Sequence, residues 1–226
     1  MLRIVAATRV DRETFLKESL LGRSIDRVVV REDVELTVTY ENTVGLPDLY
    51  NNALARADDA DVLIFMHDDV WIDDWFLPER LRQALDQFAV VGVAGNRRRL
   101  PKQPGWWTTD SSTQLCDYDE EYLSGSIAHL DSDGVARVAY YGEVPSPVKL
   151  LDGVFLAFRV GPVRRAGVGF DPRFKFHHYD MDFCRSCEQA DLTMGTWPIA
   201  LTHGSGGQLS DQWRAVYLEY LKKWRE

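Results

Sequence analysis

Two adjacent carboxylates follow an apolar run that is typical of a buried strand. The run covers 62–66, and His67, Asp68 and Asp69 come directly after it. In an open α/β sheet, ligands bind beyond the carboxyl ends of the strands, so these side chains stand where a ligand would lie. Like charges this close repel each other, and a divalent cation relieves the repulsion. A metal site is therefore one interpretation, and a turn with solvated carboxylates, which Asp also favours, is the other.

A second candidate is the carboxylate pair Asp180 and Asp182, at the start of a predicted helix. Backbone N–H groups at a helix start stabilise negative charge. Aromatic residues surround the pair in the segment 170–183 and exclude part of the water. Desolvation raises the pKa of a carboxylate toward neutral pH, as base catalysis requires. Asp180 is therefore either a general base or a helix cap.

A third candidate is the segment 202–207, Thr-His-Gly-Ser-Gly-Gly. Its small residues allow the backbone to approach an anion, and His203 could complete a metal site or contact a phosphate. Taken alone this signal is weak, because the same composition is typical of flexible loops.

Alternating strands and helices must position these residues in the first half of the chain. Apolar and β-branched runs predict strands at 4–7, 28–30, 36–40, 62–66 and 90–94. Caps and helical spacing predict a helix from Asp11 to Gly22, a second over 46–58 and a third from Pro78. Such alternation implies right-handed crossovers and an α/β fold with a mostly parallel sheet.

The second half has a different character. We predict a long surface segment over 97–121, in which Arg97 to Arg99 are surface charge or phosphate ligands, and a hairpin over 122–142 that turns at 131–134. A strand over 154–159 and a helix over 179–190 follow. Ser210 caps a final helix whose aromatic stripe indicates core packing or, alternatively, a homodimer contact.

Composition narrows the possible classes of protein. The chain has 226 residues, with 26 Lys and Arg against 35 Asp and Glu, and a net charge of −9 argues against nucleic acid as a partner. Hydrophobic residues make up 45%, which excludes disorder, and no apolar run reaches the ~20 residues of a membrane helix. The apolar run at the start is too short for a signal peptide. We therefore expect a cytoplasmic protein with reduced thiols, and a half-buried pair in Cys184 and Cys187.

Taken together and in this order, these segments resemble the GT-A glycosyltransferases of family 2. The resemblance is strongest to the branch named for a streptomycin-biosynthesis protein, and it covers roughly 2–207. The matching segments are 41–53, 67–69, 91–95 with Trp106 and Trp107, 151–158 and 169–180.

The resemblance implies a GT-A (Rossmann-like) α/β fold, in which helices flank the sheet and an irregular, hairpin-bearing acceptor half follows. It implies a single domain with a nucleotide-sugar-binding half at 1–96, an acceptor and catalytic half at 97–207, and a C-terminal amphipathic helix at 208–226.

The resemblance also implies a reaction, which is transfer of a sugar from a nucleoside diphosphate sugar to an acceptor hydroxyl with inversion. Asp180 would be the base, and Asp69, helped by His203, would bind Mn²⁺ or Mg²⁺. The implied donor-binding residues are Thr8, Arg9, Glu41, Asn51, His67 and Asp68. The implied acceptor-binding residues are Trp107, Asp152, Gly153 and His178. The acceptor itself is not identified.

Two departures from the family pattern keep alternatives open. His67 stands where the metal motif has its first carboxylate, and Tyr179 stands where the catalytic pair has Glu. A catalytically silent domain that binds a nucleotide sugar is therefore one alternative. A second is a non-haem iron oxygenase that uses His178, Asp180 and His203, although such enzymes are β-sandwich or jelly-roll proteins. A nucleotidyltransferase would need a glycine-rich cationic loop that 6–10 does not supply.

Overall fold

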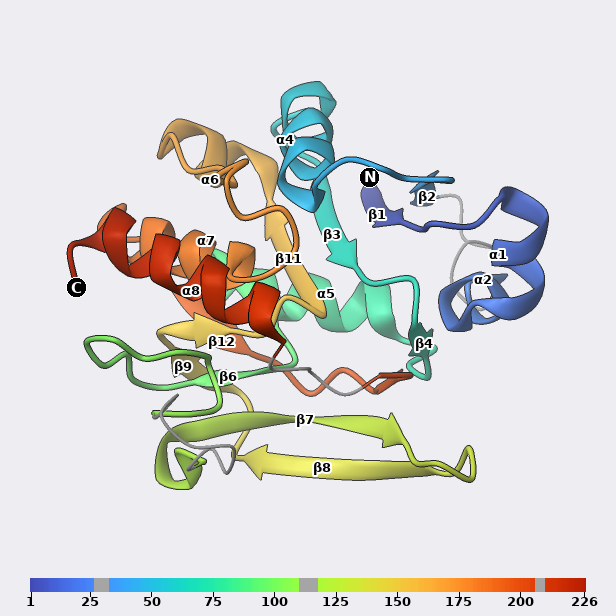
Figure 1. Ribbon diagram of the computed structural model, residues 1–226. Helices are drawn as coiled ribbons and strands as arrows, with labels where there is room; N and C mark the ends of the chain where they lie inside the picture. The colour runs from blue at the N-terminus through green and yellow to red at the C-terminus, as the bar shows by residue number, and fades with distance from the viewer. Residues whose placement is uncertain (27–32, 110–117, 206–209) are drawn as a thin grey trace.

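The computed structural model describes residues 1–26, 33–109, 118–205 and 210–226. The predicted strand at 28–30 and Cys116 lie outside these residues. The elements form a mixed α/β structure with two sheets, and helices cover the larger sheet (Figure 1). Among the described helices, none is long and apolar enough to span a bilayer.

The central sheet has seven strands in the order β2-β1-β3-β11-β5-β12-β9. Their bounds are β1 Leu2–Ala7, β2 Val34–Thr39, β3 Val62–Met66, β5 Val90–Gly92, β9 Ser146–Val148, β11 Phe155–Arg159 and β12 Met194–Thr196. β1 is parallel to β2 and β3, and β5 is parallel to β12. β11 is antiparallel to β3 and β5, and β9 is antiparallel to β12. The expectation of a mostly parallel sheet is confirmed, with β11 and the edge strand β9 running against the common direction.

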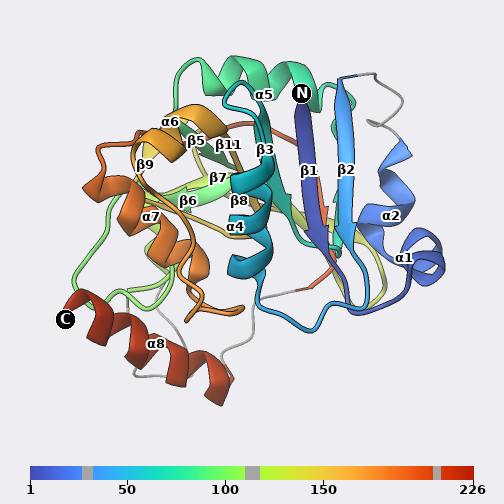
Figure 2. The ribbon, with the colours of Figure 1, turned by 90° about the horizontal axis from the view of Figure 1, so that it is seen from above.

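Strand β3 is buried along its whole length because helices lie on both faces of the sheet. Its side chains alternate between two cores, with Leu63 and Phe65 in one and Ile64 and Met66 in the other. The first core also holds residues of α4 (Leu46–Arg56), α6 (Val160–Arg165), α7 (Tyr179–Gln189) and α8 (Asp211–Trp224). The second holds residues of α1 (Arg12–Glu18), α2 (Leu20–Ser24) and α5 (Leu77–Leu85). Figure 2 shows α4 and α5 on opposite sides of the strands.

The second sheet has the order β10-β6-β7-β13-β4, and β8 pairs with β7. Its strands are β4 Val70–Ile72, β6 Ala94–Asn96, β7 Leu123–Leu130, β8 Ala136–Gly142, β10 Leu150–Leu151 and β13 Leu201–His203. A 3₁₀ turn, η1 (Glu120–Tyr122), leads into β7. The predicted hairpin is confirmed as β7 and β8, and its turn closes where the Asp131 N–H donates to the Val135 carbonyl at 3.0 Å.

The strand predicted over 90–94 is wrong as one element, because the chain changes sheets at Val93. β5 belongs to the central sheet and β6 to the second sheet. In β7, which pairs antiparallel with β6, Gly125 lies opposite Ala94; its φ is +113°, and a Cβ there would lie 2.1 Å from the Val93 carbonyl oxygen. The close approach of β7 therefore requires glycine.

The first predicted helix is also divided. Asp11 caps α1 as expected, since its carboxylate accepts the Thr14 N–H at 2.8 Å. Gly22 does not end this helix, because it lies inside the separate helix α2, which Ser19 caps. A Cβ at residue 22 would lie 2.1 Å from the Phe15 carbonyl oxygen, so the glycine allows α2 to fold tightly against α1.

The aromatic stripe of α8 packs inside the protein. Tyr217 and Tyr220 are buried in the first core, and Ser210 caps the helix as predicted. At the far end, the Lys223 ammonium lies 2.6 Å from the fully buried carboxylate of Asp182. The Trp224 indole N–H donates to the same carboxylate at 2.9 Å. This contact fixes α8 against α7.

The expectation of a surface segment over 97–121 is wrong for 103–106, 108 and 119, which are buried. Trp106 and Thr108 are buried, and the Asn96 amide donates to the Trp106 carbonyl at 2.9 Å. Arg98 donates to the Asp119 carboxylate at 2.9 Å, so its guanidinium forms an ion pair within the protein. Cys184 and Cys187 are likewise fully buried free thiols rather than half-buried ones.

Candidate active site

A cleft of about 1110 Å³ opens beyond the carboxyl ends of β1, β2 and β3. The chain segments that follow these three strands line it, as the strand-end rule predicts. Five residues singled out from the sequence are among the lining residues, namely Thr8, Arg9, Glu41, Asp68 and Asp69. The cleft exceeds the volume that a drug-sized ligand usually fills.

Backbone hydrogen bonds hold the floor of this cleft. The Thr8 N–H donates to the Thr39 carbonyl at 2.9 Å, and the Asn42 N–H donates to the Thr8 carbonyl at 2.8 Å. Glu41 has a φ of +49°, a left-handed conformation that turns the chain sharply after β2. These bonds fix the loops after β1 and β2 to each other, so the cleft is formed in the protein as it stands.

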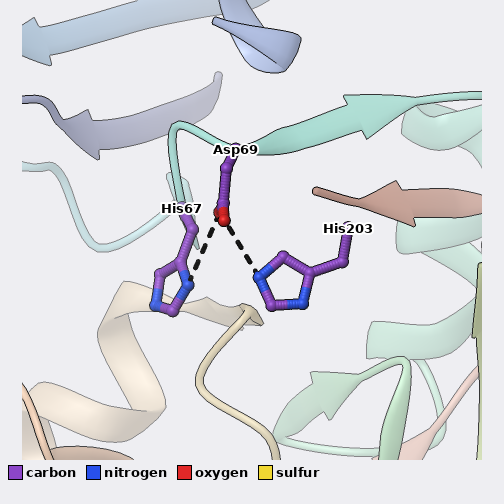
Figure 3. A group of neighbouring side chains, drawn as sticks. All are labelled: His67, Asp69 and His203. Atoms are coloured by element: carbon purple, nitrogen blue, oxygen red, sulfur yellow. Dashed lines mark ion pairs between the residues drawn. The ribbon is translucent and has the colours of Figure 1, made fainter. Parts of the chain in front are cut away.

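Three side chains beside the cleft form a group that could hold a metal ion. One ligand atom each of His67, Asp69 and His203 lies within 4.8 Å of the others (Figure 3). The Asp69 Oδ1 is 3.3 Å from His203 Nε2 and 4.0 Å from His67 Nδ1. Strand register brings them together, because His203 pairs with Val70, the residue next to Asp69.

Electrostatics favour the ligand forms of His67 and Asp69, but not that of His203. Burial lowers the pKa of His67, so its ring is neutral at physiological pH. Burial opposes ionisation of Asp69, but hydrogen bonds from His203 and Ser205 outweigh it and hold its pKa well below the usual range. Burial likewise opposes the charged form of His203. The contact with Asp69 outweighs this effect of burial and raises the pKa of His203. A metal ion would therefore compete with a proton for the His203 imidazole.

Asp180 lies in the first turn of α7 and is partly exposed. Its Oδ2 accepts the Gly153 N–H at 3.1 Å, and its Oδ1 accepts the Met181 N–H at 2.8 Å. Burial, followed by the negative charge of Asp152, raises the pKa of Asp180 to about 7. The two backbone bonds lower it only in part, so the carboxylate can exchange a proton near neutral pH.

A chain of hydrogen bonds connects this carboxylate with the metal-ligating group. The Tyr179 hydroxyl donates to the Gly153 carbonyl at 2.8 Å, and it lies 2.9 Å from His67 Nε2. Gly153 leaves room for the hydroxyl, because a Cβ there would lie 2.4 Å from the Tyr179 oxygen. The sequence indicated each of these residues but not their contact.

Other predicted site residues lie elsewhere. The Asn51 side chain exchanges two hydrogen bonds with the Phe170 backbone, at 2.7 and 2.9 Å. His178 is 4% exposed, bonds the Pro104 carbonyl at 3.1 Å and packs on Trp213 of α8. Neither is among the residues that line the cleft, since both side chains are occupied by internal contacts. The expectations of a donor contact for Asn51 and an acceptor contact for His178 are therefore withdrawn.

The remaining acceptor-side candidates surround Asp180 or lie near the tryptophan segment. The Asp152 carboxylate accepts the Val154 N–H at 3.0 Å, which holds the loop before β11. Trp107 is half-buried, and its ring lies 5.2 Å from that of Tyr118. The set His178, Asp180 and His203 of the oxygenase alternative is not brought together, and within the described ranges the ligand group contains His67 instead of His178.

Sequence reasoning missed several cleft residues. Lys175 and Phe176 precede α7, Ser205 follows β13, and Gln212 lies in the first turn of α8. Ser205 donates to the Asp69 carboxylate at 2.6 Å. Its place in the small-residue segment 202–207 was the available signal. Lys175 and Gln212 carried none, because only the packing of α7 and α8 brings them to the cleft.

Comparison with known proteins gives the fold and the family. Residues 8–214 match a family described as glycosyltransferase like. Among curated proteins no sequence matches significantly. The Pyrobaculum calidifontis mannosyltransferase PcManGT, solved with GDP-Man and Mn²⁺, is 13% identical with a TM-score of 0.53 over 100% of this chain and 64% of its own.

Two further solved structures have the same fold. The catalytic domain of Drosophila beta1,4galactosyltransferase 7, in complex with xylobiose, is 12% identical with a TM-score of 0.53, over 96% of this chain and 79% of its own. TarS 1-349 from S. aureus is 10% identical with a TM-score of 0.50, over 90% of this chain and 60% of its own. This chain therefore spans less than two thirds of the mannosyltransferase and of the TarS fragment. Its two-sheet α/β structure is the GT-A fold, and the chain belongs to the glycosyltransferase-like family.

Proposed function

We propose that the protein is a metal-dependent, inverting glycosyltransferase that moves a sugar from a nucleoside diphosphate sugar to an acceptor hydroxyl. The observation that carries this proposal is the contact chain from His67 through Tyr179 and Gly153 to Asp180. This contact chain joins a carboxylate whose pKa is near 7 to the metal-ligating group. That group lies at the edge of a cleft large enough for a nucleotide. Membership of the glycosyltransferase-like family supports the reaction class.

The separations between the Asp69 carboxylate and the two imidazoles fit a divalent ion. Two atoms that bind one ion at about 2.1 Å lie about 3.0 Å apart at a right angle and about 4.2 Å apart when opposite. The separations of 3.3 and 4.0 Å from Asp69 Oδ1 fall in this range. Two imidazoles and one carboxylate favour Mn²⁺ over Mg²⁺, which prefers oxygen ligands. When bound, the ion would offset the negative charge of the departing diphosphate.

The cleft residues would hold the donor. Arg9 is exposed in the loop after β1, and its guanidinium suits a diphosphate, to which it can donate two parallel hydrogen bonds. Glu41 and Asp68 present carboxylate oxygens that accept hydrogen bonds from sugar hydroxyl groups. Thr8 is buried and shapes the floor. The mannosyltransferase of the same fold was solved with a nucleoside diphosphate sugar, which supports this donor class.

Asp180 would act on the acceptor. Its carboxylate takes the proton of the acceptor hydroxyl, whose oxygen forms a bond to the anomeric carbon as the bond from that carbon to the diphosphate oxygen breaks. One displacement of this kind inverts the anomeric configuration. Each carboxylate oxygen accepts one backbone N–H, so lone pairs remain for the acceptor. We place Asp152, Gly153 and Trp107 on this acceptor side.

Ligand-induced stabilisation tests the donor and metal assignment. Thermal unfolding of the wild type is measured with a panel of nucleoside diphosphates and their sugars, with and without Mn²⁺. A ligand that binds the native state raises the midpoint. We expect a Mn²⁺-dependent rise with one nucleotide, lost in Asp69→Ala and retained in Asp133→Ala, which removes an exposed carboxylate from the hairpin turn. A response to Fe(II) but to no nucleotide would overturn the proposal.

Turnover separates the transferase from a silent donor-binding domain. Donor hydrolysis and transfer to a panel of sugar, peptide and small-molecule acceptors are followed by NMR, which reports the anomeric configuration of the product. We expect an inverted product from the wild type and none from Asp180→Asn, which still binds donor. Donor binding without turnover of any acceptor would favour the silent domain, and a retained configuration would refute the inverting mechanism.

A further inference from the structure

His67 and Tyr179 are 112 positions apart in the sequence and touch in the structure. His67 follows β3, and Tyr179 is the first residue of α7. The Tyr179 hydroxyl oxygen lies 2.9 Å from His67 Nε2, and Tyr179 is 2% exposed. The two positions at which the chain departs from the family pattern are therefore partners.

The direction of this hydrogen bond follows from the other partner of the hydroxyl. A tyrosine hydroxyl carries one hydrogen, and a backbone carbonyl can only accept. The Tyr179 hydroxyl donates its hydrogen to the Gly153 carbonyl at 2.8 Å. Toward His67 the hydroxyl oxygen can therefore only accept, so His67 Nε2 must carry a hydrogen.

A neutral imidazole has one N–H and one free lone pair. With the hydrogen on Nε2, the lone pair of His67 is on Nδ1. Nδ1 is the atom that faces Asp69, at 4.0 Å from its Oδ1, and Figure 3 shows it on the same side as His203. The opposite tautomer would direct an N–H toward the ion and leave Nε2 facing the hydroxyl oxygen lone pairs.

We infer that Tyr179 is a positioning residue that holds His67 in the Nε2–H tautomer and so makes Nδ1 the third metal-ligating atom, beside Asp69 and His203. The inference rests on the metal site of the proposed function. It also links that site to the base, because Gly153, which accepts from Tyr179, donates its N–H to Asp180 at 3.1 Å. A shift of Tyr179 would therefore affect both the metal site and the Asp180 carboxylate.

A purely packing role for Tyr179 gives different expectations. Its ring lies 5.8 Å from that of Tyr50 and 6.3 Å from that of Phe170, so it fills the core whether or not its hydroxyl acts. Tyr179→Phe keeps the ring and removes only the hydroxyl. Tyr217→Phe is the matched control, because it removes a buried tyrosine hydroxyl that, like that of Tyr179, donates to a backbone carbonyl, here that of Lys102.

The tautomer is measured directly in metal-free protein. Two-bond ¹H–¹⁵N NMR correlations of the histidine ring distinguish Nε2–H from Nδ1–H, and the His67 signals are assigned by their loss in His67→Gln. We expect Nε2–H in the wild type and in Tyr217→Phe, and a mixture or Nδ1–H in Tyr179→Phe. An Nδ1–H tautomer in the wild type, or the same tautomer in Tyr179→Phe as in the wild type, would overturn the inference. This readout does not depend on any activity.

Titration calorimetry with Mn²⁺ alone tests the consequence for the metal. Loss of a partner that orients a ligand weakens metal binding by about 10- to 100-fold, and we expect this in Tyr179→Phe. His67→Ala should weaken binding at least as much, and adding Tyr179→Phe to it should change little, because the hydroxyl acts through the imidazole. Tyr217→Phe should bind as the wild type does.

The outcomes distinguish this inference from the proposed function. If Asp69→Ala loses Mn²⁺ while Tyr179→Phe binds it as tightly as the wild type, the metal site stands and the positioning role of Tyr179 is refuted. If the wild type itself binds no Mn²⁺, both fail. Thermal unfolding of each metal-free variant establishes that a weaker affinity does not reflect loss of the fold.

Discussion

Replacing Asp180 with Asn should change how the stability of the protein depends on pH. Burial and the charge of Asp152 raise the pKa of Asp180 from 3.8 to about 7 in the folded protein. Between these values the native state binds more protons than the unfolded state, so this carboxyl makes the free energy of unfolding fall as the pH rises. Above pH 7 the native protein holds an ionised carboxylate in a partly dry site, which is the state that base catalysis needs.

The size of the effect follows from the two pKa values. A group that titrates at 3.8 when unfolded and at about 7 when folded loses about 2.6 kcal/mol of stabilisation between pH 5 and pH 8. Asp180 is partly exposed, and the water that reaches it reduces the difference to about 2 kcal/mol. Asparagine does not titrate. The variant should therefore gain about 2 kcal/mol relative to the wild type between pH 5 and pH 8.

Urea unfolding at both pH values measures this change. Asparagine has one side-chain acceptor oxygen, so one of the N–H groups of Gly153 and Met181 loses its partner. That cost is the same at both pH values and cancels in the comparison, as do the other titrating groups, which both proteins contain. A stability difference between variant and wild type that is equal at pH 5 and pH 8 would refute the raised pKa and, with it, the physical basis for Asp180 as the base.

Three further perturbations follow from the contacts of the site and its supports. Gly153→Ala places a Cβ 2.4 Å from the Tyr179 oxygen, so we expect about 2 kcal/mol less stability and weaker Mn²⁺ binding, by urea unfolding and calorimetry. Lys223→Met removes the cation beside the buried Asp182 carboxylate, so the free energy of unfolding should fall by about 3 kcal/mol in urea at pH 7. Because the pKa of Asp180 is about 7, kcat/KM for sugar transfer should rise with pH and level off above about 7 in a steady-state pH profile.

Each of these three has a control and a contradicting result. Gly105→Ala meets no atom closer than 3.4 Å, and an effect as large as that of Gly153→Ala would show that steric contact at residue 153 is not the cause. Lys222→Met removes an exposed neighbouring lysine, and equal destabilisation by both lysine variants would contradict the role of the Asp182 pair. A profile of kcat/KM that is flat from pH 5 to pH 9 would show that no group with a pKa near 7 limits the reaction.

Local signals in the sequence were sufficient for single elements. The continuous apolar run of β3 predicted a strand covered on both faces, and the structure buries all five residues. Asp11 and Ser210 predicted helix starts because a capping side chain acts on N–H groups within its own first turn. The turn at 131–134 predicted the β7 and β8 hairpin for the same reason, since its hydrogen bonds span only a few residues.

Local signals failed where a neighbour distant in sequence decides the backbone path. Glycine is a residue type that often ends a helix, but the close approach of α1 and α2 places Gly22 inside a second helix. The apolar run 90–94 is one strand by pattern and two strands in the fold, because β5 pairs in the central sheet and β6 pairs with β7 in the second sheet. His178 and Asn51 looked like ligand contacts because polar residues near motifs often are, yet His178 is buried against α8 and the Phe170 backbone bonds Asn51.

In the candidate site, too, the sequence indicated the residue types, and the tertiary structure decided how they are arranged. The residue types of His67, Asp69, Asp180 and His203 indicated metal and base chemistry as one interpretation, beside a solvated turn and a helix cap. Their geometry was decided by the fold alone. The register of β13 against β4 brings His203 to Asp69, and the packing of α7 beside β3 brings Tyr179 to His67 across 112 positions. Strand order and register are set by the burial of whole faces, so no short segment of sequence specifies them.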